Sequence, residues 1–283
     1  MPSIDAFIFA AGLGTRMGPL SSILPKPAWT LKGKPLLQWA ADSLSEAGCY
    51  KVACNAHHHI AAIKSIAGDL EVFEEPVILG TGEPIRRIAS RISDEGLLVW
   101  NADVMANPPF AQLKNECIKR DVGVGWLLVP HPGGQWTELY TDSGGRILPR
   151  GTTGPKGPFL FTGASWWGAE AAEQIPENCF DVRDFLAQYP RHFGIVVEPF
   201  CWLEIGTPDQ LIHAAAKLAP EDEGRIPGCY LHPTATEIIN TNRFIRCIFG
   251  PGARLSPDTK DNIAEYKDEL WFAEDGVQMR VKL

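Results

Sequence analysis

The chain has 283 residues, of which 45% are hydrophobic and 21% are charged, and its formal net charge is −8. This length and composition are ordinary for a globular protein with one large domain, or a domain with an appendage. The negative charge argues against a nucleic-acid partner, and no apolar run approaches the roughly 20 residues of a membrane span.

Cysteine usage and the N-terminal residues indicate the compartment. The seven cysteines form no C-x-x-C pair and are odd in number. This pattern favours free thiols in a reducing compartment over a disulfide framework or a zinc site. The first five residues lack the basic start of a signal peptide. We therefore expect a cytoplasmic protein.

A glycine-rich loop is the first feature that indicates function. An apolar run at residues 7–9 predicts a buried strand, and the sequence AAGLGTRMGPLSSILPKP follows it directly. Gly12 and Gly14 permit a sharp turn that brings backbone N–H groups close to a ligand. Arg16 carries a guanidinium suited to phosphate oxygens, and Lys26 lies between two prolines that stiffen its backbone. The loop is a predicted polyphosphate-binding site.

Two common phosphate-binding loops are excluded. The chain has no G-x-x-x-x-G-K-[ST] pattern, so the loop is not a P-loop. Its glycines at 12, 14 and 18 are spaced one residue too widely for the dinucleotide fingerprint. The next predicted strand, 51–54, is followed by Asn55 rather than by the acid that would hold a ribose. An ordinary glycine-rich loop is the alternative.

Helical and strand patterns alternate through the first half of the chain. The predicted helices cover residues 35–47, 60–67, 84–91 and 109–120. The predicted strands cover residues 51–54, 70–73, 97–100 and 123–129. Such alternation predicts an α/β fold with a mostly parallel central sheet, flanking helices and right-handed crossovers.

Three adjacent histidines, His57–His59, follow predicted strand 51–54. Adjacent residues do not share a helix face, and metal-binding pairs on a helix prefer spacings of three or four. We therefore favour a structural strand-to-helix turn here and keep a metal site as the alternative.

Two segments lie where ligands commonly bind in open α/β sheets. The sequence Gly80-Thr81-Gly82 opens a predicted helix and presents backbone N–H groups, although a plain turn is the alternative. Asp103 follows the strongly apolar strand 97–100, at the edge where such sheets bind ligands. A carboxylate there suits Mg²⁺ bound together with substrate phosphates, and capping of the next segment is the alternative.

The second half is less regular. Its predicted strands cover 138–140, 146–148, 159–167 and 194–199, and its predicted helices cover 182–189 and 208–218. We divide the chain into a main domain (1–219), an acidic linker (220–228) and a short β appendage (229–283). The stretches LHPTA and IFGPGA recur in the appendage, and so short an array cannot bury its own core. We expect it to pack on the main domain or on a second subunit in a homodimer, with an appendage that plays no part in catalysis as the alternative.

The glycine loop also carries a family resemblance. Its stretches AAGLGTRM, PLS and PKP resemble the signature of the sugar-1-phosphate nucleotidyltransferases, which join a nucleoside triphosphate to a sugar 1-phosphate and release pyrophosphate. The resemblance extends to about Leu218. Its spacing is most similar to the N-acetylmuramate-1-phosphate uridylyltransferases and mannose-1-phosphate guanylyltransferases. It implies a Rossmann-like (GT-A-like) nucleotidyltransferase fold for the main domain. The appendage at 229–283 resembles degenerate turns of a left-handed β-helix.

The resemblance implies a set of site residues. Arg16 and Lys26 would be catalytic, and Asp103 and Glu204 would hold Mg²⁺. Thr162 and Gly163 would face the sugar, although a strand bulge is the alternative for Gly163. The residues implied in nucleotide binding are Ala11, Gly12, Gly14, Thr15, Glu75, Gly80, Thr81 and Gly82.

The chain departs from the family pattern at two positions. The family motif is aromatic-x-Asp-x-Gly-Thr-Pro, whereas residues 202–208 read WLEIGTP and place Glu204 at the metal-binding Asp. Ala102 replaces the glycine that normally precedes Asp103. A glutamate is one methylene longer, so the metal or the backbone would have to shift. Nothing in the sequence shows a compensating change.

The implied function is Mg²⁺-dependent transfer of a nucleotidyl group from a nucleoside triphosphate to a sugar 1-phosphate. Similarity favours UTP with an amino-sugar 1-phosphate such as N-acetylmuramate 1-phosphate, a precursor of cell-wall or surface polysaccharide. Alternatives are GTP with mannose 1-phosphate and CTP with phosphocholine. A further alternative is a non-catalytic sensor or regulatory subunit that binds a nucleotide sugar.

Overall fold

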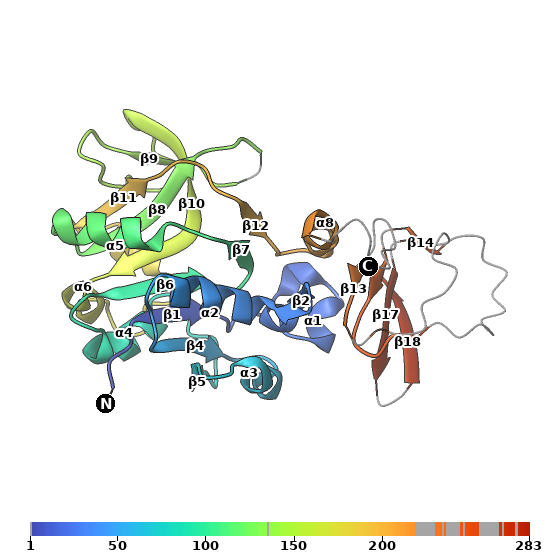
Figure 1. Cartoon of the computed structure of the whole chain (residues 1–283). Coiled ribbons are helices and arrows are strands. Elements are labelled where there is room, and N and C mark those ends of the chain that lie inside the picture. The colour runs from blue at the N-terminus through green and yellow to red at the C-terminus, as the bar shows by residue number, and fades with distance from the viewer. Residues whose placement is uncertain are drawn as a thin grey trace.

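The computed structural model describes residues 2–134, 136–218, 230–233, 235, 244–245, 247–254, 266–267, 269–274 and 277–283. A large sheet with its helices makes up most of the molecule, and a small sheet lies at the end away from the N-terminus (Figure 1). The expected linker, 220–228, falls outside the described residues. No described helix combines the length and the apolar character needed to cross a membrane.

The large sheet has the strand order β11-β8-β10-β6-β1-β4-β5, with β9 paired to β10. Its strands are β1 (Ala6–Phe9), β4 (Val52–Ala56), β5 (Glu71–Glu74), β6 (Leu97–Asn101), β8 (Val124–Pro130), β9 (Leu139–Thr141), β10 (Lys156–Trp167) and β11 (His192–Val196). The neighbours β5, β4, β1 and β6 are parallel, as are β8 and β11, whereas β10 runs antiparallel to β6, β8 and β9. The predicted α/β class with a mostly parallel sheet is confirmed.

Helices flank both faces of this sheet (Figure 1). They are α2 (Leu36–Glu46), α3 (Ile60–Ile66), α4 (Glu83–Ile88), α5 (Phe110–Lys119), α6 (Ala169–Glu173) and α7 (Val182–Leu186). The helix α8 (Pro208–Leu218) lies apart from the large sheet, next to the C-terminal sheet (Figure 1). On α2 the residues Leu37, Ala40 and Leu44 are fully buried, because spacings of three and four place them on one face.

Some predicted boundaries were wrong. The helix expected at 84–91 is split into α4 and a 3₁₀ turn, η3 (Ala89–Arg91), and the helix expected at 182–189 ends at Leu186. The strand expected at 194–199 is β11, which starts and ends earlier. Residues 146–148 form no continuous strand. Arg146 bridges Phe193 on one side and Ile147 bridges Thr141 on the other, so neither ladder continues.

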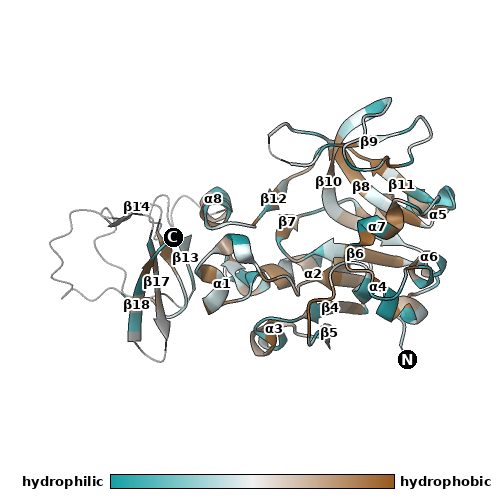
Figure 2. Ribbon diagram, turned by 180° about the vertical axis from the view of Figure 1, so that it is seen from behind, coloured by the Kyte–Doolittle hydropathy of each residue, from teal (hydrophilic) through white to brown (hydrophobic). Residues whose placement is uncertain are grey.

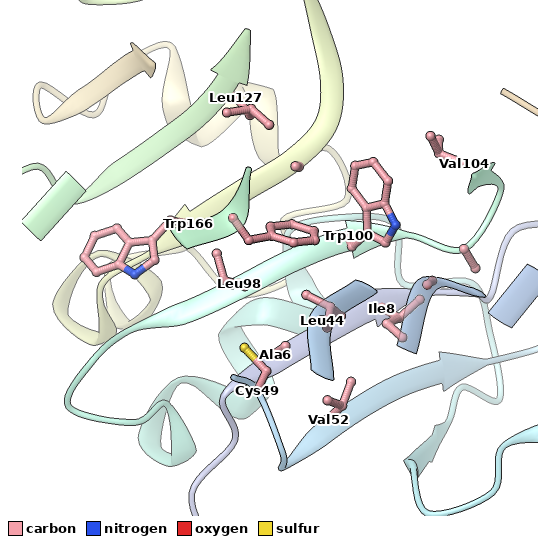
Figure 3. Packing of buried hydrophobic residues seen from close by; sticks show 14 of the residues in the cluster. Ala6, Ile8, Leu44, Cys49, Val52, Leu98, Trp100, Val104, Leu127 and Trp166 are labelled. Atoms are coloured by element: carbon pink, nitrogen blue, oxygen red, sulfur yellow. The ribbon is translucent and has the colours of Figure 1, made fainter. Parts of the chain in front are cut away.

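The core lies on both faces of the sheet. Ala6 and Ile8 of β1 and Leu98 and Trp100 of β6 point to the α2 face, where Figure 3 shows them packed together. The residues between them point to the opposite face, because successive side chains of a strand alternate. Strands buried on both faces are apolar throughout, and Figure 2 shows β6 mostly in apolar colours.

The strand order creates a ligand-binding edge. From β1 the chain moves outward through β4 and β5, and then returns to place β6 on the other side of β1. Such a reversal opens a crevice at the carboxyl ends of the two central strands, where open α/β sheets bind ligands. The glycine loop leaves the carboxyl end of β1, and Asp103 follows the carboxyl end of β6.

The C-terminal region contains parallel ladders. The strands β13 (Tyr230–Leu231), β15 (Ile248–Phe249) and β17 (Glu269–Glu274) pair in parallel, and β18 (Val277–Lys282) returns antiparallel to β17. A second parallel pair joins β14 (Phe244–Ile245) to β16 (Tyr266–Lys267). Stacked coils would produce such ladders, so the pairing agrees with the β-helix hypothesis, which stays a prediction.

The C-terminal sheet packs on the main domain. One apolar cluster joins Tyr230, Ile248 and Leu270 of this sheet to Met17 and Trp29, which flank the glycine loop. The same cluster includes Leu211 and Ile212 of α8, and both views place the sheet beside α8 and α1 (Leu20–Ile23) (Figures 1 and 2). Packing on the main domain was one of the two expected arrangements. The homodimer stays a prediction.

Candidate active site

The glycine loop leaves β1 and turns immediately. The amides of Ala10 and Ala11 donate to the Asn55 Oδ1 atom at 2.7 and 3.2 Å, which fixes the start of the loop on β4. Gly14 adopts a φ of +64°, a left-handed conformation that favours glycine. Within the described chain, the amides of Gly12, Leu13 and Gly14 donate no hydrogen bond. These three donors, unlike that of Ala11, are open to an anion.

Lys26 lies directly beside this loop. It begins the 3₁₀ turn η2 (Lys26–Ala28), and its Cβ atom is 3.6 Å from the position that a Cβ atom on Gly14 would occupy. Its Nζ atom donates to the Asp103 Oδ2 atom at 2.5 Å. The two side chains are only 14% and 19% exposed. The structure therefore brings the predicted catalytic lysine and the predicted metal ligand into one half-buried ion pair.

The backbone segments that carry the two predicted metal ligands, Asp103 and Glu204, are adjacent. After β6 the chain turns at Asp103 into β7 (Val104–Ala106), which pairs antiparallel with β12 (Trp202–Glu204). Glu204 lies opposite Val104, and the amide of Ile205 donates to the Asp103 carbonyl oxygen at 2.8 Å. Residues 101 positions apart in sequence thus lie at one strand pair.

Glu204 has a hydrogen-bond donor on each carboxylate oxygen. The Arg16 Nη2 atom donates to Oε1, and the Trp136 Nε1 atom donates to Oε2, both at 3.1 Å. The Glu204 side chain is 18% exposed, whereas that of Arg16 is 60% exposed. A Cβ atom on Gly206 would lie 3.0 Å from the Arg16 Nη2 atom, so glycine lets the guanidinium lie across this backbone.

The donor set fits a hard divalent cation. Asp103 and Glu204 would offer carboxylate oxygens, which Mg²⁺ prefers, and substrate phosphates commonly complete such a site. Metal binding by these two residues stays a prediction. Among the described residues, no group of three or more His, Cys, Asp or Glu side chains could hold a metal ion. Phosphate oxygens of the substrate and water would therefore have to supply the remaining ligands.

The histidine triplet makes backbone contacts. His57 Nδ1 lies 2.8 Å from the Glu75 carbonyl oxygen, and the Nε2 atoms of His58 and His59 each lie 3.2 Å from the Ser21 carbonyl oxygen. The His58 and His59 contacts connect the β4–α3 turn to the segment around Ser21, and the His57 contact connects it to the residue after β5. The turn position favoured from the sequence agrees with them.

Glu75, predicted near the base, is 2% exposed. Its Oε1 atom accepts from Asn55 Nδ2 at 2.7 Å and its Oε2 atom accepts from the Leu79 amide at 3.0 Å. Asn55 therefore links the start of the glycine loop, through Glu75, to the loop before α4. A direct contact of Glu75 with the base stays a prediction.

Residues 80–82 are held against segment 179–182. The Thr81 amide donates to the Phe180 carbonyl oxygen at 2.7 Å, and the Thr81 hydroxyl accepts from the Val182 amide at 3.0 Å. A Cβ atom on Gly80 would lie 2.0 Å from the Phe180 carbonyl oxygen, and one on Gly82 would lie 2.6 Å from that of Cys179. The two glycines thus permit close backbone packing. Their contact with a base stays a prediction.

Glu83, which the sequence analysis missed, anchors this same junction. Its side chain is 4% exposed and accepts from Arg86, Arg87 and the Asn178 amide at 2.8–3.0 Å. The Arg86 hydrogen bonds above all lower the pKa of the Glu83 carboxyl to about 2. No motif in the sequence indicated this residue.

Thr162 and Gly163 lie on β10 at a register shift between Phe161 and Ser165. The Thr162 hydroxyl is buried and donates to the Leu127 carbonyl oxygen at 3.1 Å. Gly163 has a φ of +93°, and a Cβ atom there would lie 2.9 Å from Asn101 Nδ2. The bulge alternative for Gly163 therefore agrees with the structure. The contacts of both residues with a sugar stay predictions.

An open α/β sheet that carries a glycine loop and two cation–carboxylate pairs at its topological switch point has the architecture of a nucleotide-binding protein. A family model described as the MobA-like NTP transferase domain matches residues 6–192. The chain belongs to this family and is a nucleotidyltransferase.

Curated relatives confirm the resemblance seen in the sequence. The chain is 22% identical over 284 residues to the mannose-1-phosphate guanylyltransferase of Mycobacterium tuberculosis, and the match covers 91% of this chain and 78% of the relative. It is 28% identical over 233 residues to the N-acetylmuramate alpha-1-phosphate uridylyltransferase of Neisseria meningitidis serogroup B, and that match covers 75% of this chain and 97% of the relative.

Solved structures share the fold. HddC from Yersinia pseudotuberculosis complexed with GMP-PN superposes with a TM-score of 0.66 at 22% identity, covering 76% of this chain and 100% of that chain. A putative glucose-1-phosphate thymidylyltransferase from Bacillus anthracis in complex with a sucrose superposes with a TM-score of 0.64 at 14% identity, covering 79% and 98%. The expected nucleotidyltransferase fold is therefore confirmed.

Proposed function

We propose that this chain transfers a nucleotidyl group from a nucleoside triphosphate to a sugar 1-phosphate in an Mg²⁺-dependent reaction. The named activities of the two curated relatives support a sugar 1-phosphate as the acceptor. The observation that carries the proposal is the pair of ion pairs, Lys26–Asp103 and Arg16–Glu204, beside the open amides of the glycine loop.

The reaction needs charge neutralisation more than acid–base chemistry. A phosphate oxygen of the sugar 1-phosphate attacks the α-phosphorus, the bond from that phosphorus to the α,β-bridging oxygen breaks, and pyrophosphate leaves with the bonding electrons. The attacking oxygen is already anionic, so the protein supplies neither a nucleophile nor a general base. The obstacle is the approach of two polyanions, which preorganised positive groups reduce.

The loop amides and the two basic side chains would have separate tasks. The amides of Gly12–Gly14 and the exposed Arg16 guanidinium would bind the β- and γ-phosphates. Lys26, held by Asp103, would lie at the α-phosphate, where negative charge accumulates in the transition state. Asp103 and Glu204 would hold Mg²⁺, which when bound neutralises phosphate charge. A triphosphate would compete with Glu204 for Arg16.

The favoured substrates are UTP and an amino-sugar 1-phosphate such as N-acetylmuramate 1-phosphate. The support is the relative with uridylyltransferase activity, whose match covers 97% of its own length. The guanylyltransferase relative keeps GTP with mannose 1-phosphate as the second pair to test.

The test is pyrophosphate release in the presence of Mg²⁺. UTP, GTP, CTP and dTTP would each be combined with a panel of sugar 1-phosphates and with phosphocholine. Release with one sugar 1-phosphate supports the proposal and names both substrates. Release with phosphocholine alone would replace the proposed acceptor class.

A non-catalytic sensor is the second candidate function, because both oxygens of Glu204 have donors within the protein. Glu204→Asp restores the aspartate of the family motif and separates the two candidates. A large gain in rate would indicate a decayed site, whereas a loss of rate would indicate a site adapted to glutamate.

A further inference from the structure

Trp136 lies outside every motif of the sequence, yet it contacts a residue at the centre of the site. It belongs to the connection between β8 and β9, a glycine- and proline-rich segment. Its indole N–H donates to the Glu204 Oε2 atom at 3.1 Å across 68 positions of sequence. The contact is half-buried, so water competes with it less than at an open surface.

The Trp136 side chain is itself held in place. Its ring meets that of Trp202 edge to face, with centroids 5.8 Å apart and planes at 70°. The indole N–H of Trp202 donates to the Thr162 carbonyl oxygen at 2.9 Å, which ties the pair to β10. His131 Nε2 lies 3.2 Å from the Trp136 carbonyl oxygen. The donor to Glu204 therefore projects from a packed aromatic pair.

Glutamate at position 204 has a length that suits two partners. One carboxylate oxygen accepts from Trp136 and the other from Arg16, each at 3.1 Å. An aspartate would draw the carboxylate back by about 1.5 Å, the length of one C–C bond. Such a shift would stretch one or both contacts beyond hydrogen-bond distance. The glutamate and Trp136 therefore form a matched pair.

We propose that Trp136 is a positioning residue that holds Oε2 of Glu204, so that Oε1 can exchange Arg16 for a divalent cation. This inference rests on the proposed function for the cation and goes beyond it by explaining why the site carries glutamate. Trp136 supplies the compensating contact that the sequence did not show. Loss of a residue that orients a metal ligand typically weakens metal binding 10–100-fold.

The experiment measures Mn²⁺ binding to the full chain by electron paramagnetic resonance, with Mn²⁺ alone and with Mn²⁺ plus UTP. Trp136→Phe removes the indole N–H and keeps an aromatic ring, and we expect Mn²⁺ binding to weaken at least about tenfold. Trp166→Phe is the matched control. Its indole N–H donates to the Glu95 carbonyl oxygen at the amino end of β6, away from Asp103, so binding should not change.

Glu204→Asp tests the same contact from the other side and does not depend on the folding of the Trp136 variant. We expect it to weaken Mn²⁺ binding, and we expect Trp136→Phe to add little in the Glu204→Asp background, because aspartate already misses the indole. If Trp136→Phe weakened Mn²⁺ binding as much in the Glu204→Asp background as in the parent, the proposal would be overturned. Unchanged Mn²⁺ binding by Trp136→Phe, or no Mn²⁺ binding by the parent chain even in the presence of UTP, would also overturn it.

Kinetics separate this inference from the proposed function. In an active enzyme, Trp136→Phe should raise the Mg²⁺ concentration needed for half-maximal rate and leave the acceptor KM nearly unchanged. A parent chain that binds Mn²⁺ but releases no pyrophosphate with any substrate pair would refute the proposed function. The Mn²⁺ measurements on the variants would still decide the role of Trp136.

Discussion

Tyr230→Phe tests whether the C-terminal sheet stabilises the segment that follows Lys26. The Tyr230 side chain is 1% exposed, and its hydroxyl lies 2.9 Å from the Thr30 Oγ1 atom and accepts from the Thr30 amide at 3.3 Å. Its ring meets Trp29 edge to face, with centroids 5.6 Å apart. The substitution keeps this ring contact and removes only the hydroxyl.

The expected loss of stability follows from the two polar groups of Thr30 that would be left without a partner. Thr30 is 8% exposed, so its amide and hydroxyl would lose their partner without gaining full access to water. An unpaired buried polar group costs about 1–3 kcal/mol, and we expect the free energy of unfolding to fall by about 2 kcal/mol. For a chain of 283 residues the Tm should fall by roughly 3–4 °C.

Denaturant unfolding and thermal melting check this value. Tyr50→Phe is the control, because Tyr50 is 82% exposed and its change should stay within about 0.5 kcal/mol. Thr30→Val in the Tyr230→Phe background removes the orphaned hydroxyl, so the double variant should lose less than the sum of the single changes. A Tyr230→Phe variant as stable as its parent would refute the packing described here.

Three further predictions concern catalysis and pH. Lys26→Ala should lower kcat about 10²–10³-fold and change KM far less, because Lys26 acts on transition-state charge; a change in KM alone would contradict that role. Glu83→Gln should lower stability by about 2 kcal/mol at pH 7, with exposed Glu173→Gln as the neutral control. Hydrogen bonds from Arg86 depress the pKa of Glu83 to about 2, so this difference should disappear as pH falls from 4.5 towards 2; a difference that persists at pH 2 would be contrary to it. Burial raises the pKa of the Tyr230 hydroxyl to about 12. The stability that the neutral hydroxyl contributes is therefore present below pH 10 and is lost as the pH rises to 12. Between pH 10 and 12 the free energy of unfolding should fall less steeply in Tyr230→Phe than in the parent.

The fold could be predicted where local pattern and packing agree. The apolar faces of α2 and α8 and the apolar runs of β1 and β6 specify helices and strands by their periodicity. The register shift on β10 and the isolated bridges at Arg146 and Ile147 depend on neighbouring strands, so short-range pattern could not reveal them.

The site could be predicted in its residue types more than in its contacts. The glycine loop, Lys26 and Asp103 carry local signals, and the structure brings them together. The Trp136–Glu204 hydrogen bond spans 68 positions and the Tyr230–Thr30 bond spans 200, so neither leaves a local pattern. Such contacts exist only after the sheets have formed.

The most direct test of the account is the fate of labelled phosphorus. The chain would be incubated with its active sugar 1-phosphate and a nucleoside triphosphate labelled at the α- or the γ-phosphorus. The account predicts that the α-label appears in the nucleotide sugar and that the γ-label appears in pyrophosphate. Transfer of the γ-label to the sugar, or retention of both labels in the triphosphate, would contradict attack on the α-phosphorus.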